Sequence, residues 1–167
     1  MFAIRRAEPA EWPRLADIER AADGMFADVG IVFPPGFMID EAGPDDPVWV
    51  AGKPPVGFAY AAIEVGTIDG EACHLHQLAV HPDHGRSGTG TALLNTVISY
   101  ATARSMPVTL TTFRDIPWNG PWYAKHGFVE WPPERWGPRI GEIVRDERAA
   151  GLHLLGERVV LRLDTVR

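Results

Sequence analysis

The stretch from His74 to Leu94, HLHQLAVHPDHGRSGTGTALL, concentrates the residue types in this sequence that could do chemistry. It begins with His74 and His76, two imidazoles two positions apart in an apolar run. Successive side chains of a strand point to opposite faces, so a strand here would place both imidazoles on one face. An imidazole suits a general base that works near neutral pH. The pair predicts a proton path, with two alternatives: a metal site that adds His81 and His84, or a structural, hydrogen-bonded pair.

A glycine-rich loop with the spacing G-x-x-G-x-G follows the histidines. Glycine lets the backbone approach a ligand closely and take a positive φ, and the first turn of a helix attracts phosphate. The loop therefore predicts a pyrophosphate site, with a tight turn that binds nothing as the alternative. Its spacing matches neither the dinucleotide fingerprint nor the P-loop. The residues predicted to contact the pyrophosphate are Gly85, Arg86, Ser87, Gly88, Thr89, Gly90 and Thr91.

The hydrophobic pattern predicts the elements that hold these residues. Strands are expected over residues 2–7, twice within 48–66 around a turn, and over 71–82, 107–113 and 157–165. Helices are expected over about 10–22, 89–105, within 119–128, and over 139–152, and residues 27–47 are expected to be loop-rich with room for one short helix. This order predicts an α/β (α+β) fold around one mixed sheet.

Composition bounds the function further. The 167 residues predict one domain over 1–167, and 46% hydrophobic with 23% charged residues is typical of a soluble globular protein. No apolar run approaches the ~20 residues of a membrane span, and the N-terminus has no apolar core of a secretory signal. Cys73 is the only cysteine, which favours a reducing, cytoplasmic location. A net charge of −6 argues against nucleic acid and for cationic or neutral small partners.

The segment LAVHPDHGRSGTGTALL resembles the acetyl-CoA-binding motif of the GNAT N-acetyltransferases, in which a strand and a Pro-containing turn precede [RQ]-x-x-G-x-[GA]. The basic or Gln position of that motif falls on Gly85, and the arginine lies one residue later, at Arg86. PVTLTTF and WNGPWYAKHGF resemble the next strand and the N-x-x-x-x-Y-x-x-x-G-F segment, with a shortened spacing between Asn119 and Tyr123. The resemblance covers about residues 48–130, with the acetyl-CoA core at about 72–130.

The resemblance implies a GNAT-like fold, with a mixed, mostly antiparallel central sheet flanked by helices. It implies acetyl-CoA as co-substrate, no metal, and direct attack of a primary amine in a ternary complex. The backbone of Leu78, Ala79 and Val80 would hold the pantetheine arm, and the N–H near Val80 would polarise the thioester. Tyr123 would protonate the leaving thiolate.

The histidine pair and Asn119 are each open to more than one interpretation. HLHQLAVH is similar to the strand of the arylalkylamine (serotonin) N-acetyltransferases of this family, where paired histidines carry the amine proton to solvent; by position, His74 and His76 would do so here. Asn119 would either bond the cofactor arm or cap the short helix that follows it.

Four aromatic residues are candidates for the wall of an acceptor pocket: Phe26, Phe33, Trp118 and Trp122. Aromatic faces suit a cationic amine, although Trp131 and Trp136 in the same cluster could equally serve packing. Glu64 is an alternative base, with a solvated strand edge as the favoured interpretation, and Cys73 is expected to be a buried small residue.

The partner is expected to be a small-molecule amine, with neither nucleic acid nor membrane involved. Alternatives are a peptide or protein amine, a catalytically silent acyl-CoA-binding module, and a metal-dependent hydrolase. The chain is expected to be a monomer or a homodimer, the latter through pairing of the last strand.

Overall fold

The computed structural model describes residues 2–66 and 70–165. Within these ranges seven strands are hydrogen-bonded in the order β1-β2-β3-β4-β5-β7-β6. β4 and β5 run parallel, whereas the pairs β1–β2, β2–β3, β5–β7 and β6–β7 are antiparallel. The predicted fold class, a mixed and mostly antiparallel sheet with flanking helices, is confirmed.

The strands are β1 Ile4–Arg6, β2 Val48–Ala51, β3 Gly57–Val65, β4 Glu71–Val80, β5 Val108–Phe113, β6 Val129–Glu130 and β7 Arg158–Leu163. The α-helices are α1 Trp12–Asp23, α2 Thr89–Ala103, α3 Gly120–Lys125 and α4 Pro138–Ala149. The short 3-10 helices used below are η2 Gly24–Val29, η3 Met38–Glu41 and η4 Pro82–His84.

The chain forms two compact units. The first comprises Met1–Ala62 and Leu75–Tyr100, and the second comprises Ile63–His74 and Ala101–Arg167. β3, β4 and α2 each contribute residues to both units. The single acetyltransferase-like domain expected from the chain length stays a prediction.

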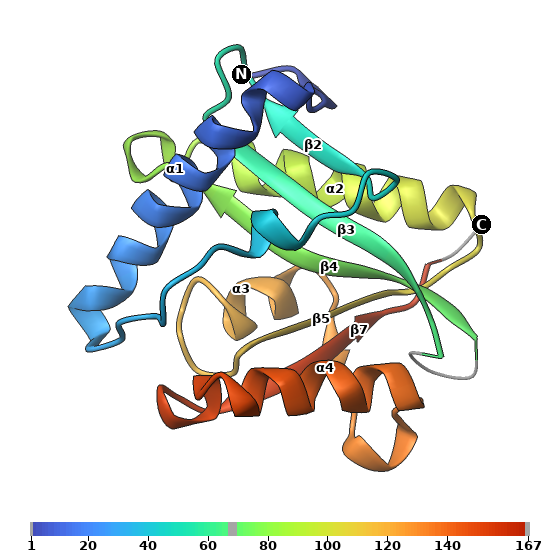
Figure 1. Ribbon diagram of the computed structural model, residues 1–167. Helices are drawn as coiled ribbons and strands as arrows, with labels where there is room; N and C mark the ends of the chain where they lie inside the picture. The colour runs from blue at the N-terminus through green and yellow to red at the C-terminus, as the bar shows by residue number, and fades with distance from the viewer. Residues whose placement is uncertain (1, 67–69, 166–167) are drawn as a thin grey trace. The chain divides into compact units, whose positions relative to one another are not determined.

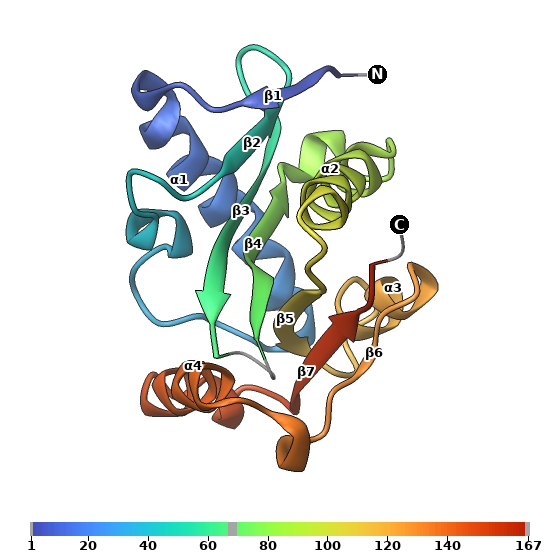
Figure 2. The same ribbon diagram turned by 90° about the vertical axis from the view of Figure 1, so that its right-hand side faces the viewer.

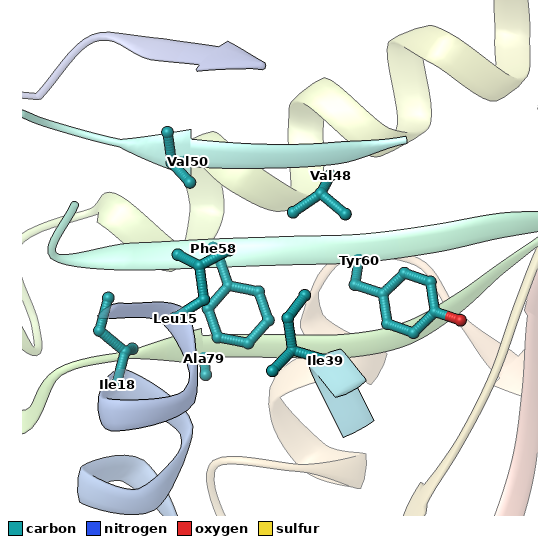
Figure 3. Packing of buried hydrophobic residues seen from close by; sticks show 8 residues of the cluster. All are labelled: Leu15, Ile18, Ile39, Val48, Val50, Phe58, Tyr60 and Ala79. Carbon is teal, nitrogen blue, oxygen red and sulfur yellow. The ribbon is translucent and has the colours of Figure 1, made fainter. Parts of the chain in front are cut away.

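In the first unit, α1 and α2 cover opposite faces of the strands β2 to β4 (Figures 1 and 2). The apolar residues of α1 recur at helical spacing, and Leu15 and Ile18 are fully buried. They pack with Val50, Phe58 and Ile39 in one cluster, which Figure 3 shows. Burying two such side chains stabilises the fold by roughly 1.5–3 kcal/mol each, so α1 is fixed to the sheet mainly by this contact.

The apolar stripe predicted for the helix after the glycine loop is also buried, since Leu93, Leu94 and Val97 have no exposed surface. A Cβ added to Gly57 of β3 would lie 3.3 Å from Leu93 Cδ1, so α2 approaches this strand closely. This packing fixes the first turn of α2, and with it the end of the loop.

In the second unit, β5 and β7 form the centre, and α3 and α4 lie on opposite faces of β7 (Figures 1 and 2). Ile140 and Ile143 of α4 pack against Val160 of β7. The sequence pattern missed β6, because two residues are too few for a detectable alternation. β7 has β5 on one side and β6, over Leu161 and Arg162, on the other, and its pairing across a dimer stays a prediction.

The loop-rich segment 27–47 departs from expectation in one respect. Two 3-10 helices, η2 and η3, overlap or lie within it, where one short helix was expected.

In the ranges that the structure covers, no helix combines the length and the apolar character needed to cross a membrane.

Candidate active site

The edge of β4 that faces away from β3 carries backbone groups that could pair with an extended ligand. His81 N donates to Val56 O at 2.8 Å, and Ala79 O lies 3.1 Å from the position of a Cβ added to Gly57. Both groups therefore point toward β3. Since neighbouring residues of a strand point their N–H groups to opposite edges, those of Leu78 and Val80 point away from β3.

This geometry corrects the expectation for one of the three strand residues. Leu78 and Val80 present N–H and C=O groups on the outer edge, as strand addition requires. Ala79 instead turns its backbone toward β3, and its side chain belongs to the buried cluster around Leu15.

The loop between η4 and α2 takes its left-handed conformations at Arg86, with φ of 59°, and at Gly88, with φ of 83°. Gly85 has φ of −67°, a backbone conformation that any residue adopts. Ser87 Oγ donates to His84 O at 2.6 Å and lies 2.9 Å from Thr89 Oγ1, which ties the loop together.

The donor set of this loop fits a diphosphate. The hydrogen bond from Ala92 N to Gly88 O, at 3.0 Å, belongs to the first turn of α2. The N–H groups of Thr89, Gly90 and Thr91 lie before Ala92 in this turn, where a helix offers them no carbonyl partner of its own. Residues 85–88 are exposed, and a Cβ added to Gly88 would meet nothing within 4 Å. Unpaired N–H groups, the positive end of a helix of 15 residues and the Arg86 guanidinium all favour an anion here.

His74 is held inside the second unit. It is 1% exposed, and its Nδ1 lies 2.8 Å from Thr109 Oγ1 on β5. The register of β4 and β5 sets Thr109 opposite His74. This bond fixes the orientation of the imidazole. Sequence reasoning missed Thr109, because only the pairing of β4 with β5 brings the two residues together.

His76 is half-buried in the first unit and stacks on Tyr60 of β3, with ring centroids 4.9 Å apart and an interplanar angle of 18°. Tyr60 lies at one end of the buried cluster, with its hydroxyl directed away from the other members (Figure 3). Tyr60 was also missed, since an aromatic residue in an apolar strand has no signal that distinguishes it from packing.

Tyr123 of α3 is 8% exposed, and burial raises the pKa of its hydroxyl. Its ring contacts Trp122 and Phe128 edge-on, at centroid distances of 5.0 Å and 5.5 Å. The residue is therefore packed within the second unit and does not lie on a solvated face. A raised pKa keeps the hydroxyl neutral, and this is the form that can donate a proton.

Asn119 occupies the N-cap position of α3, but its side chain makes no capping bond. Its Nδ2 donates to Trp118 O at 3.0 Å instead. The capping interpretation is therefore wrong, and a contact with the cofactor arm stays a prediction.

Glu64 is mostly buried and Cys73 is fully buried. The Glu64 side chain is 15% exposed and accepts from Arg139 Nε at 2.8 Å, which corrects the interpretation as a solvated strand edge. Cys73 is fully buried, and burial raises the pKa of its thiol to about 12. A buried neutral thiol is a packing residue, as expected.

The aromatic candidates divide into two groups. Trp136 Nε1 donates to Trp131 O at 2.7 Å, and both rings pack against the α4 cluster, so these two are structural. The remaining four stay predictions. Phe26 and Phe33 form an edge-on pair with centroids 4.9 Å apart. Trp118 is half-buried, and Trp122 lies 4.5 Å from the His126 ring.

The metal alternative gains no support from the residues that the structure describes, in which no group of three or more metal-ligating side chains gathers. His81 Nδ1 instead accepts the Asp83 N–H at 3.2 Å, and the His81 and His84 rings lie edge-on.

The comparison with protein families gives one finding. A family model described as an acetyltransferase (GNAT) domain matches residues 44–130.

Solved structures with the same fold include the ribosomal-protein-S18-alanine N-acetyltransferase from Escherichia coli, with TM-score 0.68 and 18% identity over 100% of this chain and 96% of that one. A second is N-acetylglutamate synthase from Neisseria gonorrhoeae, complexed with coenzyme A and N-acetyl-glutamate, with TM-score 0.69 and 18% identity over 100% of this chain and 36% of that one. A third is Arabidopsis thaliana NAA60 in complex with acetyl-CoA, with TM-score 0.59 and 14% identity over 98% of this chain and 99% of that one.

Proposed function

Because this chain belongs to the GNAT acetyltransferase family, we propose that it moves an acetyl group from acetyl-CoA to a primary amine of a small molecule, by direct attack in a ternary complex. As a member of that family it is an N-acetyltransferase with acetyl-CoA as co-substrate. The observation that carries the proposal is the continuity of β4 with the loop before α2. One short stretch of chain offers an outer strand edge, on which the Leu78 N–H bonds a side chain and not a neighbouring strand, and then a set of anion donors.

The donors on the first unit fit the two polar parts of acetyl-CoA. The outer edge formed by Leu78 and Val80 would pair with the pantetheine arm, and the loop from Gly85 to Thr91 would hold the pyrophosphate. Asn119 would add one contact to the arm. Acetyl-CoA supplies a thioester carbonyl carbon that an amine can attack.

The reaction balances when the nitrogen loses two protons and the sulfur takes one. The protonated amine gives up a first proton, and its nitrogen forms the C–N bond as the C–S bond breaks. The nitrogen then loses a second proton to become the neutral amide, the thiolate takes one proton, and one proton is released to solvent. A primary amine has a pKa of about 10.4 in water, so the enzyme must supply a proton acceptor near neutral pH.

His74 and His76 would take the amine proton through water. The hydrogen bond between His74 and Thr109 and the stacking of His76 on Tyr60 support this role, because each partner holds an imidazole in one orientation. A fixed ring loses less freedom when a water and a substrate bind.

Tyr123 would return the proton to the thiolate, and the Val80 N–H would polarise the thioester carbonyl. The packing of the Tyr123 ring against Trp122 and Phe128 supports the first role, because it holds the hydroxyl in one position. The direction of the Val80 N–H away from β3 supports the second.

A cationic or neutral small amine fits the net charge of −6. Phe26, Phe33, Trp118 and Trp122 would line its pocket through their aromatic faces. A free, buried Cys73 supports the reducing cytoplasm as the place of action.

Calorimetric titration with acetyl-CoA, with NADH and ATP as controls, tests the co-substrate site. We expect acetyl-CoA alone to bind tightly. Equal binding of all three, or none, would contradict the assignment of the loop.

Thiol release from acetyl-CoA in the presence of arylalkylamines, polyamines and a peptide with a free N-terminal amine tests the acceptor. We expect turnover with a small amine. Turnover with the peptide alone would favour a protein substrate, and binding without turnover would favour a silent module. With the best amine, Tyr123→Phe should lower kcat with little change in KM.

A further inference from the structure

Glu19 is a buried carboxylate for which the proposed reaction has no use. It lies on α1, is 2% exposed, and has no ion-pair partner among those that the structure gives for the described residues. Its Oε2 accepts from Met38 N at 2.6 Å, and its Oε1 accepts from Ile39 N at 3.1 Å. A buried charge must be satisfied by donors, and here two of them are the first N–H groups of η3.

The side-chain amide of Gln77 on β4 also approaches Glu19. Burial raises the pKa of the Glu19 carboxyl, and the amide of Gln77 acts with the N–H groups of Met38 and Ile39 to lower it. The other end of the same amide, Oε1, accepts the Leu78 N–H at 2.9 Å. A carboxylate only accepts and a backbone N–H only donates, so these two partners fix the orientation of the amide. Gln77 therefore bridges Glu19 and Leu78.

The Leu78 N–H is one of the two donors on the outer edge of β4 that the proposed function assigns to acetyl-CoA. In this structure that donor is occupied by a side chain one residue away. A neutral hydrogen bond of this kind is worth little net free energy in water, so a ligand carbonyl can replace it.

The opposite end of the bridge reaches the segment between α1 and β2. Ile39 packs in the same cluster as Tyr60, as Figure 3 shows, and Tyr60 carries the stacked His76 ring. A change in the donors around Glu19 would therefore alter the surroundings of Met38 and Ile39. Ile39 packs in the same cluster as Tyr60, which supports the imidazole of His76.

We infer that Gln77 is a positioning residue that occupies the Leu78 N–H until acetyl-CoA displaces it, and that its bond to Glu19 relays this displacement to Met38 and Ile39. The inference rests on the proposed function, because it takes the outer edge of β4 as the acetyl-CoA site. It makes acetyl-CoA binding and the conformation of residues 38–39 energetically coupled, and such coupling is reciprocal.

The test compares wild-type protein with Gln77→Met, which keeps the length of the side chain and removes both hydrogen bonds. The Leu78 N–H is then available without competition, so acetyl-CoA should bind roughly three- to tenfold more tightly, the value of one such bond. In wild-type protein the amide NMR signals of Met38 and Ile39 should shift on addition of acetyl-CoA. In Gln77→Met they should stay in place.

Ile18→Val is the matched control, because it loosens the α1 core and leaves the bridge intact. It should keep the wild-type affinity and the wild-type shifts. A merely structural role of Gln77 would give the two variants the same behaviour, and this result would overturn the inference.

The outcomes separate the inference from the proposed function. If wild-type protein binds no acetyl-CoA, both are overturned. If it binds, but Met38 and Ile39 do not respond, or respond equally in Gln77→Met, only the inference is overturned. Should Gln77→Met fail to fold, absence of the Met38 and Ile39 response in wild-type protein is sufficient to overturn it.

Discussion

At the scale of single residues, the partners of the two histidines define what each can contribute. His74 is bonded to Thr109 and His76 is stacked on Tyr60. Both contacts orient a ring, and orientation is the property that a proton path needs and that a sequence motif cannot supply.

The double variant His74→Ala/His76→Ala tests that path. We expect kcat/KM to fall by about 10²-fold and its acid limb to flatten, because protonation of the imidazoles would no longer stop the reaction. Acetyl-CoA affinity should change little. Thr109→Val, which keeps side-chain volume and removes the hydroxyl, should show a smaller loss of kcat. An unchanged pH profile in the double variant would contradict the proton path.

Asp23, at the end of α1, predicts a pH dependence of stability. Burial, with a smaller contribution from Glu19, raises its pKa to about 7 from an ordinary value of 3.8. The folded state thus binds this proton more tightly than the unfolded state. The stabilising contribution is complete below about pH 4 and is lost as the pH rises through about 7.

Asp23→Asn removes the ionisable group. Its gain in melting temperature should therefore be larger at pH 8 than at pH 5, reaching roughly 2–4 °C after allowance for solvent screening. The exposed Asp28 gives a control, Asp28→Asn, with the same change in net charge. Thermal unfolding measures both variants. Equal gains in melting temperature at both pH values would show that burial does not raise the pKa of Asp23.

At the scale of elements, close approaches of backbone fix where the functional helices begin. α3, which carries Tyr123, starts at Gly120, and a Cβ there would lie 2.3 Å from Arg114 O and 3.0 Å from Phe113 O. Backbone atoms at the end of β5 cannot move away cheaply.

Gly120→Ala should destabilise the protein by about 1–3 kcal/mol and lower kcat, because the start of α3 must shift. Gly24→Ala is the control, since Gly24 has φ of −60° and a Cβ there would meet nothing within 4 Å. That variant should gain about 0.4–1 kcal/mol. Chemical denaturation measures both, and equal stability of the two variants would contradict the contact with Arg114.

The loop before α2, which is the proposed pyrophosphate site, has a strained backbone at Arg86. Arg86 holds φ of 59°, a conformation that costs a side-chain-bearing residue roughly 1–2 kcal/mol. Arg86→Gly should therefore raise stability by about 1 kcal/mol and weaken acetyl-CoA binding by about tenfold, since it would remove the charge-assisted bond that we propose between Arg86 and the pyrophosphate.

Ser105 supplies the control, because it holds φ of 57° outside this loop. Ser105→Gly should raise stability in the same way and leave acetyl-CoA affinity unchanged. If Arg86→Gly also leaves the affinity unchanged, Arg86 is a turn residue alone.

At the scale of the whole molecule, the single cysteine reports on opening of the fold. Cys73 is fully buried and its thiol pKa is raised to about 12, so alkylation at pH 8 requires exposure of β4. A ligand that binds only the folded state lowers the population of open forms by mass action.

Acetyl-CoA at about 100 times its Kd should therefore slow alkylation of Cys73 about 100-fold, when reclosing outpaces the reaction. Mass spectrometry with iodoacetamide follows a single modification. ATP at the same concentration is the control. Alkylation at the rate of an unfolded peptide, with or without ligand, would contradict the burial of the thiol.

The amino-acid sequence alone determined the order of most elements, the glycine loop and its place before α2, and the buried stripe of that helix. These features are local, since hydrophobic periodicity and glycine spacing act over a few residues. It also determined which residue types could do chemistry, His74, His76 and Tyr123 among them.

Only the tertiary structure decided which partners these residues have. Thr109 lies 35 positions from His74, and Glu19 lies 58 positions from Gln77, so no local pattern joins either pair. It turned Ala79 toward β3, bonded Glu64 to Arg139, placed a positive φ on Arg86 as well as on Gly88, and gave β7 two neighbours. The physical reason is that strand register and burial are set by packing of the whole sheet, which satisfies polar groups with donors and acceptors from distant parts of the chain.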